Sequence, residues 1–195
     1  MEKDLRVGIL ASTNGTDLPA IFAAKIPGVQ FPCLVTNVER CGAAQKAQAN
    51  GVPTFFVEAR GKTREEFDRA VAGIFQEKKV DLILLIGFMR ILSKFFCHQF
   101  SGKILNVHPS LLPAFAGGMN LDVHSEVLRR GCKVSGATVH FVNEEVDGGA
   151  ILLQECVRVE AQETAQTLKA KVQALEGRML VKAIEIFRDK KAGDK

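Results

Sequence analysis

Asn106-Val-His108-Pro-Ser-Leu-Leu-Pro places a group that can carry a proton beside a group that can bind an oxyanion. Asn106 and His108 end an apolar run, and residues two apart on a strand point to the same side. A histidine titrates near neutrality, and an asparagine amide can donate a hydrogen bond to a developing negative charge. The pair predicts acid–base catalysis. The alternative is a buried structural histidine beside a turn-forming asparagine.

Asp147-Gly-Gly is the second segment with chemical potential. Two glycines permit unusual backbone angles and the close approach of a ligand. A carboxylate beside an imidazole orients the ring and favours its charged form, which makes Asp147 a candidate partner for His108. The alternative is a solvated acidic turn, and this is our interpretation of Glu144 and Glu145.

Ser12-Thr-Asn-Gly-Thr-Asp17 lies between the first expected strand and the first expected helix. Backbone N–H groups at such a turn point outward and carry partial positive charge, which suits a phosphate. The segment has neither the G-x-G-x-x-G nor the Walker spacing. A plain turn in which Thr16 or Asp17 caps the helix therefore stays an alternative.

The remaining histidines and the cysteines predict no metal site. His140, inside an apolar strand, is interpreted as structural or as a pocket-wall residue, His124 stays a further candidate, and His98 is expected at a helix edge. The five cysteines are odd in number and lack C-x-x-C spacing, so neither a zinc cluster nor a disulfide framework is expected.

Short apolar runs alternate with helical patterns through the first two thirds of the chain. Expected strands at 5–11, 31–36, 52–57, 80–86 and 103–107 alternate with helices that include 16–24, 42–50 and 63–78. This order predicts an α/β fold with a doubly wound, mostly parallel sheet. Two further strands, 134–142 and 151–159, are expected to form a hairpin-like pair, and 163–188 one long final helix. Ligands of such sheets bind at the carboxyl ends of the strands, where all three motifs above are expected.

Composition narrows the class of protein. The chain has 195 residues, of which 47% are hydrophobic and 25% charged, and this predicts one globular domain over residues 1–195. A net charge of +4, with no Trp and no Tyr, does not favour nucleic acid but suits a small anionic ligand. The longest apolar run, 82–88, is too short to cross a membrane. Met1–Arg6 lacks the pattern of a signal peptide, so we expect a cytoplasmic protein.

Taken together, three segments resemble the folate-dependent formyltransferases. They are Asn106-x-His108-Pro-Ser-Leu-Leu-Pro, Gly136-x-Thr-Val-His-Phe-Val and Asp147-Gly-Gly, and Gly87-Phe-Met-Arg-Ile-Leu-Ser93 adds to them. The resemblance extends over about residues 5 to 187 and is strongest to the members that formylate glycinamide ribonucleotide in purine synthesis. It implies a Rossmann-like formyltransferase fold and 10-formyltetrahydrofolate as co-substrate, with no metal.

The resemblance also implies roles for individual residues. Asn106, His108 and Asp147 match the catalytic trio. Gly15, Thr16 and Asp17 match the loop that holds the ribonucleotide phosphate, Arg64 matches an arginine that assists there, and Glu176 matches a glutamate that contacts the glycinamide. The residues that match the folate pocket are Met89, Arg90, Ile91, Leu92, Val142, Asn143, Glu144, Glu145 and Val146.

The sequence departs from the family pattern at four places. Thr13 stands where the family usually has Gly, and Asp17 where it has Asn. A family His-x-His segment is replaced within 116–124, and Gly177 replaces a His after Glu176. A carboxylate beside a phosphate is unfavourable unless it caps the helix and points away.

The resemblance implies formyl transfer to a primary amine, with small-molecule substrates and a monomer or homodimer. Two relatives with the same trio stay as alternatives, a sugar-nucleotide N-formyltransferase and a formyltetrahydrofolate hydrolase. The hydrolase carries an extra N-terminal domain, for which a chain whose first strand starts at Leu5 has no room. Methionyl-tRNA formyltransferase needs a C-terminal domain that is not expected here. A plain binding module for an anionic metabolite is the alternative outside the enzymes.

Overall fold

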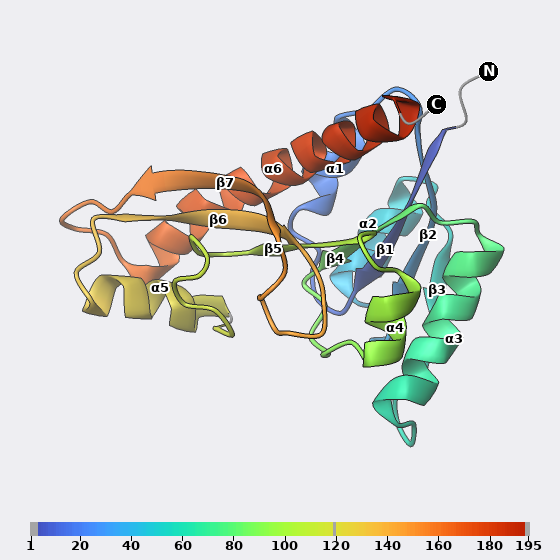
Figure 1. The fold of residues 1–195 in the computed structure, drawn as a ribbon. Helices are drawn as coiled ribbons and strands as arrows, with labels where there is room; N and C mark the ends of the chain where they lie inside the picture. Colours follow the sequence, from blue (N-terminus) through green and yellow to red (C-terminus); the bar gives the residue numbers. More distant parts are fainter. Residues whose placement is uncertain (1–3, 119, 194–195) are drawn as a thin grey trace.

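A seven-stranded sheet in the order β3-β2-β1-β4-β5-β6-β7 forms the centre of the fold (Figure 1). It is seen in a computed structural model that describes residues 4–118 and 120–193. β1 to β5 run parallel, and β6 and β7 continue the sheet in antiparallel pairing. The doubly wound, mostly parallel α/β sheet with a final antiparallel pair and a long last helix is thereby confirmed.

The element bounds follow the expected pattern closely. The strands are β1 Leu5–Ala11, β2 Val29–Thr36, β3 Thr54–Phe56, β4 Leu82–Ile86, β5 Ile104–His108, β6 Val134–Phe141 and β7 Ile151–Arg158. The helices are α1 Leu18–Ala23, α2 Gly42–Ala49, α3 Arg64–Glu77, α4 Lys94–Gln99, α5 Asn120–Arg129 and α6 Ala165–Gly193.

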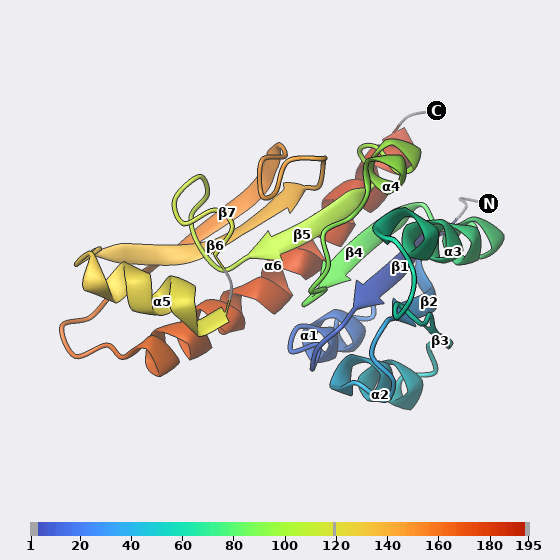
Figure 2. The same cartoon turned by 90° about the horizontal axis from the view of Figure 1, so that it is seen from below.

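Helices cover both faces of the sheet (Figures 1 and 2). α1, α2, α5 and α6 contribute to the apolar core on one face, and α3 and α4 to the core on the other. β4 shows why its sequence is an unbroken apolar run: Leu82, Leu84 and Ile86 face the first core, whereas Ile83 and Leu85 face the second. A central parallel strand is buried on both faces, so alternation of polar and apolar residues is lost.

The ends of three helices can be compared with the capping residues and bounds that the sequence predicts. Thr63 begins α3 with the expected capping box, in which its hydroxyl accepts from Glu66 N–H and the Glu66 carboxylate accepts from Thr63 N–H. α6 continues to Gly193, five residues past the expected end. Asp17, one of the two residues considered for this place, occupies the N-cap of α1, but its side chain makes no capping hydrogen bond.

The topology gathers the carboxyl ends of β1, β4 and β5 at one edge. β1 has β2 on one side and β4 on the other, so the chain order reverses between β1 and β4, and a crevice opens at such a point. Antiparallel pairing of β5 with β6 sets Asn106 opposite His140 and His108 opposite Thr138. Within the described residues, no helix is long and apolar enough to cross a membrane.

Candidate active site

A cavity of about 570 Å³ opens at this edge of the sheet. Its wall includes Asn106, His108 and Asp147 together with the other two predicted segments, Gly15–Asp17 and Met89–Leu92. Segments that are far apart in the sequence therefore meet around one space. The lining residues also include His124, His140, Lys169, Gln173 and Glu176.

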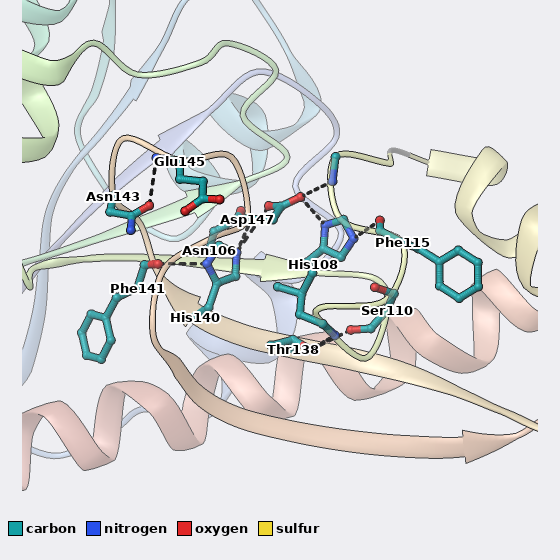
Figure 3. A network of polar contacts seen from close by, with 12 residues as sticks. Asn106, His108, Ser110, Phe115, Thr138, His140, Phe141, Asn143, Glu145 and Asp147 are labelled. Carbon is teal, nitrogen blue, oxygen red and sulfur yellow. Dashed lines mark hydrogen bonds and ion pairs between the residues drawn. The ribbon is translucent and has the colours of Figure 1, made fainter.

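His108 is buried, and each of its ring nitrogens faces an oxygen atom (Figure 3). Nδ1 lies 3.2 Å from Oδ2 of Asp147, and Nε2 lies 3.0 Å from the carbonyl oxygen of Phe115. A neutral imidazole has one N–H, so either tautomer leaves one lone pair facing an oxygen, and only the imidazolium can donate to both. This surrounding pair of acceptors therefore favours a proton on the ring.

Burial of the His108 ring disfavours its protonated form. It lowers the pKa of His108 below its ordinary value, against the upward pull of the Asp147 carboxylate and the Phe115 carbonyl. We expected Asp147 to raise this pKa, and it does contribute in that direction, but desolvation of the ring is larger. Burial pushes the pKa of Asp147 up, yet contacts with His140, Gly117 and His108 outweigh burial and hold this pKa below the usual value. Asp147 is thus ionised at neutral pH.

Asn106 is held by His140 on the neighbouring strand (Figure 3). Nδ1 of His140 lies 2.9 Å from the Phe141 carbonyl, which assigns the proton to Nδ1 and leaves Nε2 as an acceptor. The Asn106 amide donates to this Nε2 at 3.2 Å, and one of its two N–H bonds is left for a ligand. His140 Nε2 also lies 3.5 Å from Asp147, to which it donates only when the ring is protonated, and this contact makes the pocket-wall histidine part of the same polar network.

Strained backbone holds both partners of His108. Asp147 has a φ of 54° and Phe115 a φ of 60°, values that non-glycine residues rarely adopt. The N–H of Gly117 donates to Asp147 Oδ2 at 2.8 Å, which ties the loop of Phe115 to the loop of Asp147. A Cβ at Gly149 would collide with the Phe141 carbonyl, so the second glycine of Asp-Gly-Gly lets the chain return onto β6. Strain of this kind persists where the surroundings over-determine the conformation, as they often do at functional sites.

A buried hydroxyl supports the loop that follows His108. Thr138 Oγ1 donates to the Ser110 carbonyl at 2.7 Å and accepts from Leu112 N–H at 3.0 Å. The amide of Gln154 on β7 donates to the same hydroxyl and to the Leu112 carbonyl. Thr138 therefore fixes the chain just beyond the catalytic strand end, which sequence reasoning did not assign to it.

The loop between β6 and β7 is joined to α4. Glu144 forms ion pairs with Lys94 at 3.1 Å and with His98, and the Cys97 thiol donates to the Asn143 carbonyl at 3.3 Å. Glu144 is consequently not the free solvated acid of our expectation. Val142–Asp147 and Met89–Leu92 form part of the cavity wall, as does Asn106.

Ser12 fastens the first loop to its neighbours. Its hydroxyl donates to Asn37 at 2.7 Å and accepts from Met89 N–H at 3.2 Å, which links the ends of β1, β2 and β4. Thr13, the departure from the family glycine, lies against Gly87, where a Cβ would collide with its hydroxyl and where φ is 56°. The glycine at 87 thus makes room for the threonine at 13.

Two buried carboxyl groups lie at the end of the cavity lined by this loop. Asp17 and Glu176 are 6% and 7% exposed. Burial raises the pKa of Asp17 to about 6. Burial, and then the nearby Asp17 carboxylate, raise the pKa of Glu176 to about 8, against the opposing pull of Lys169. Lys169, on α6, is a cavity residue that sequence reasoning missed.

Comparison with known proteins agrees with this geometry. The sequence pattern of the formyl transferase family matches residues 5–184. The chain belongs to the formyl transferase family. It is 35% identical to phosphoribosylglycinamide formyltransferase of Haemophilus influenzae over 94% of this chain and 87% of that protein. It superposes with a TM-score of 0.90 on glycinamide ribonucleotide transformylase 1 of Symbiobacterium toebii, at 34% identity, covering 97% of this chain and 90% of the other.

A longer relative also contains this formyl transferase region. The trifunctional purine biosynthetic protein adenosine-3 of Gallus gallus is 41% identical over 93% of this chain. The chain spans only 18% of that protein's length, and the matching human and bovine proteins give the same share.

Arg64 is the predicted site residue that the structure does not bring to the first loop. It is the first residue of α3 and is outside the described set of lining residues. Asp68, one turn later, accepts a hydrogen bond from Ser93 N–H, and the charges of Arg90 and Arg64 both lower the pKa of Asp68, which burial raises. Arg90 in turn lies over the ring of Phe67 at 4.7 Å. Arg64 therefore belongs to the neighbourhood of Met89–Leu92 in this formyl transferase.

Lys169, His140 and Thr138 are the residues that sequence reasoning undervalued. His140 and Thr138 stand in the same strand two residues apart, so they share one face of the sheet, the face on which Asn106 and His108 of β5 also lie. Lys169 lies seven residues before Glu176 on α6, two helical turns, which places both on one face of that helix. The sequence shows that these residues share a face of their strand or helix, but it does not show which face lines the cavity.

Proposed function

We propose that the chain transfers the formyl group of 10-formyltetrahydrofolate to the amine of glycinamide ribonucleotide. The single observation that carries the proposal is the buried His108, which is placed between Asp147 and the Phe115 carbonyl in the wall of a cavity shared with Asn106. This is the arrangement that acyl transfer to an amine requires: a proton carrier, a carboxylate that orients it and an amide that can bind an oxyanion.

In the proposed reaction, the neutral amine attacks the formyl carbon and an oxyanion develops on the former carbonyl oxygen. The Asn106 amide donates to that oxygen through the N–H that His140 leaves available. Since Nδ1 of His108 faces Asp147, its Nε2–H is the donor for the substrate, and it exchanges the Phe115 carbonyl for the oxyanion. The bond from carbon to the folate nitrogen then breaks, and the proton lost by the amine arrives on that nitrogen.

The two ends of the cavity fit the two proposed substrates. Gly15–Asp17 and Lys169 offer backbone N–H groups and an ammonium to the ribonucleotide phosphate. Met89–Leu92 and Val142–Val146, with exposed Met89, Ile91 and Val146, offer an apolar slot to a flat folate ring. The trio lines the same cavity, where a formyl group from one ligand can meet an amine of the other.

The test is consumption of 10-formyltetrahydrofolate by the purified chain, with and without an acceptor. Consumption that requires glycinamide ribonucleotide and yields formylated product in equal amount supports the proposal. Consumption without any acceptor would indicate the hydrolase instead. Activity with an amino-sugar nucleotide, and none with glycinamide ribonucleotide, would indicate the sugar-nucleotide enzyme.

A further inference from the structure

The buried carboxyl groups of Asp17 and Glu176 take no part in the reaction proposed above, yet both line the cavity. Asp17 comes from the loop before α1, and Glu176 from the middle of α6. Two acids this deeply buried at the end proposed for a phosphate are unexpected, because like charges repel and desolvation disfavours both. The two acids are therefore candidates for a part in ligand binding at this end of the cavity.

The packing of α6 against α1 holds the two acids together. At Gly177, the residue after Glu176, a Cβ would lie 2.8 Å from the Ala20 Cβ and 3.7 Å from the Asp17 carbonyl oxygen. The helix backbone at 177 therefore rests directly on the segment that carries Asp17. A larger side chain at 177 would meet Ala20 and separate the helices, so Gly177 lets α6 approach the segment of Asp17.

Asp17 has a free acceptor aimed at no protein group. Its Oδ1 is buried and has no hydrogen-bond partner among the described residues, and its carboxyl does not cap α1. A buried carboxylate oxygen without a partner is costly when the group is charged, so this position favours a proton on the Asp17 carboxyl. A phosphate oxygen can then bond to a carboxyl of the pair only through a proton, which either the carboxyl or the phosphate carries.

The charged groups around the pair come from three helices. On α6, Lys169 opposes the pair, and on α5 His124 lies in the same cavity wall, with a pKa lowered by burial and by Lys169. On α2, Lys46 donates to the Asn14 carbonyl of the loop. α1 itself, Leu-Pro-Ala-Ile-Phe-Ala, carries no charge. With the pKa of Glu176 raised to about 8, the pair holds about one proton at neutral pH.

We propose that Asp17 is a specificity-determining residue which, with Glu176, makes this end of the cavity bind a phosphate monoester only together with one proton. The inference rests on the function proposed above for the acceptor. The proton lies between a carboxyl oxygen of the pair and a phosphate oxygen, and no covalent bond to carbon or phosphorus changes. Above pH 7 a free phosphate monoester is a dianion, so the proton must come from solvent or from the pair.

The first experiment compares wild type with Asp17→Asn, which keeps the size and removes the charge. Michaelis constants for glycinamide ribonucleotide and for formyltetrahydrofolate are measured from pH 6 to pH 9, with Asp189→Asn, an exposed acid of α6, as the matched control. We expect the wild-type acceptor constant to rise steeply above pH 7. In Asp17→Asn it should be about tenfold lower at pH 8, the effect of one pKa unit, while the folate constant stays unchanged. Titration of the substrates themselves is common to all variants and cancels in the comparison.

A second experiment does not depend on turnover. Calorimetric titration of wild type with ribose 5-phosphate at pH 8, in buffers of different ionisation heat, should show uptake of about half a proton per ligand, because the free pair, with a pKa of about 8, already holds the other half. Asp17→Asn should take up far less. Equal proton uptake by the two proteins, or an acceptor constant that Asp17→Asn leaves unchanged at pH 8, would overturn the inference. Absence of transfer to glycinamide ribonucleotide in wild type would instead reject the proposed function, and the calorimetry would still decide the role of Asp17.

Discussion

Oδ2 of Asp147 lies 3.2 Å from Nδ1 of His108, and the aspartate reaches that position with a backbone φ of 54°. The strain and the contact have one origin. The hydrogen bond from Gly117 N–H and the close contact of the chain at Gly149 restrict the conformation of the loop that carries Asp147. The carboxylate is therefore held against the imidazole ring before any ligand binds. A preorganised pair of this kind needs no rearrangement during the proton transfer.

Replacing His108 with Ala should remove most of the catalytic rate. A positioned acid–base group contributes about 10²–10⁴-fold, and we expect a loss in that range in kcat. His98→Ala is the matched control, because its side chain is 76% exposed on α4 and its ion pair with Glu144 is at the surface. Circular dichroism should report the same fold for both variants. Full activity in a well-folded His108→Ala protein would remove this histidine from the mechanism.

Asp147→Asn should lower the rate and move the pH–rate profile. Burial already lowers the pKa of His108, and Asp147 is the largest influence that raises it, so loss of the charge lowers this pKa further. The histidine-dependent limb is then expected at lower pH than in wild type. Asn is the suitable substitute because it tolerates the left-handed backbone at 147 better than other residues of its size. A profile that coincides with the wild-type profile would show that residue 147 does not act through His108.

Thr138→Val should loosen the loop after His108 without touching a substrate. The change keeps the shape and leaves the Leu112 N–H and the Ser110 carbonyl without the hydroxyl that they bond. An unsatisfied buried group costs about 1–3 kcal/mol, so the melting temperature should fall by several degrees. We also expect kcat to fall more than either Michaelis constant. Thr54→Val on the edge strand β3 serves as control, and an equal effect there would show that Thr138 has no special place in the site.

The alternation of strands and helices, and the meeting of Asn106, His108 and the first loop at one edge of the sheet, could be predicted from sequence because each follows from local pattern. The apolar run 80–86 predicts a central strand, and the carboxyl ends of parallel strands meet at one edge, so His108 and the first loop were expected together. Arg64 could not be placed in this way. Its distance from the first loop depends on how α3 packs against the segment before α4, a tertiary contact that no periodicity reports. The surroundings of Asp17 likewise depend on α6, whose Gly177, more than 150 residues later in the chain, lies against the Asp17 backbone.

Arg64→Ala should raise the Michaelis constant for formyltetrahydrofolate rather than the constant for the ribonucleotide. The sequence predicted the opposite, but Arg64 is not among the residues that line the cavity with the phosphate loop. Burial raises the pKa of Asp68, the charges of Arg90 and Arg64 oppose that rise, and Asp68 accepts from Ser93 N–H, directly after Met89–Leu92. A charged hydrogen bond contributes about 1.5–3 kcal/mol, so a change of tenfold or more is expected if Arg64 contacts an anionic part of folate. Arg60→Ala, an exposed arginine just before α3, controls for the loss of charge. A selective effect on the ribonucleotide constant would restore the original assignment.

Glu176→Gln should make the protein more stable at alkaline pH. The pKa of Glu176 is about 8 in the folded chain and near 4.5 when unfolded, so between these values the folded state holds a proton that the unfolded state lacks. Stability contributed by this group therefore falls as pH rises from about 4.5 to 8, and a glutamine has no such dependence. At pH 8.5 the variant should exceed wild type by on the order of 5 kcal/mol, with a melting temperature about 10–20 °C higher. At pH 4.5 the two proteins should melt within experimental error of each other, because the wild-type carboxyl is then protonated when folded.

The measurement is a set of melting curves over this pH range, with Glu77→Gln on the surface of α3 as control. A difference between Glu176→Gln and wild type that is the same at both pH values would mean that packing, not the proton, sets the stability at this position.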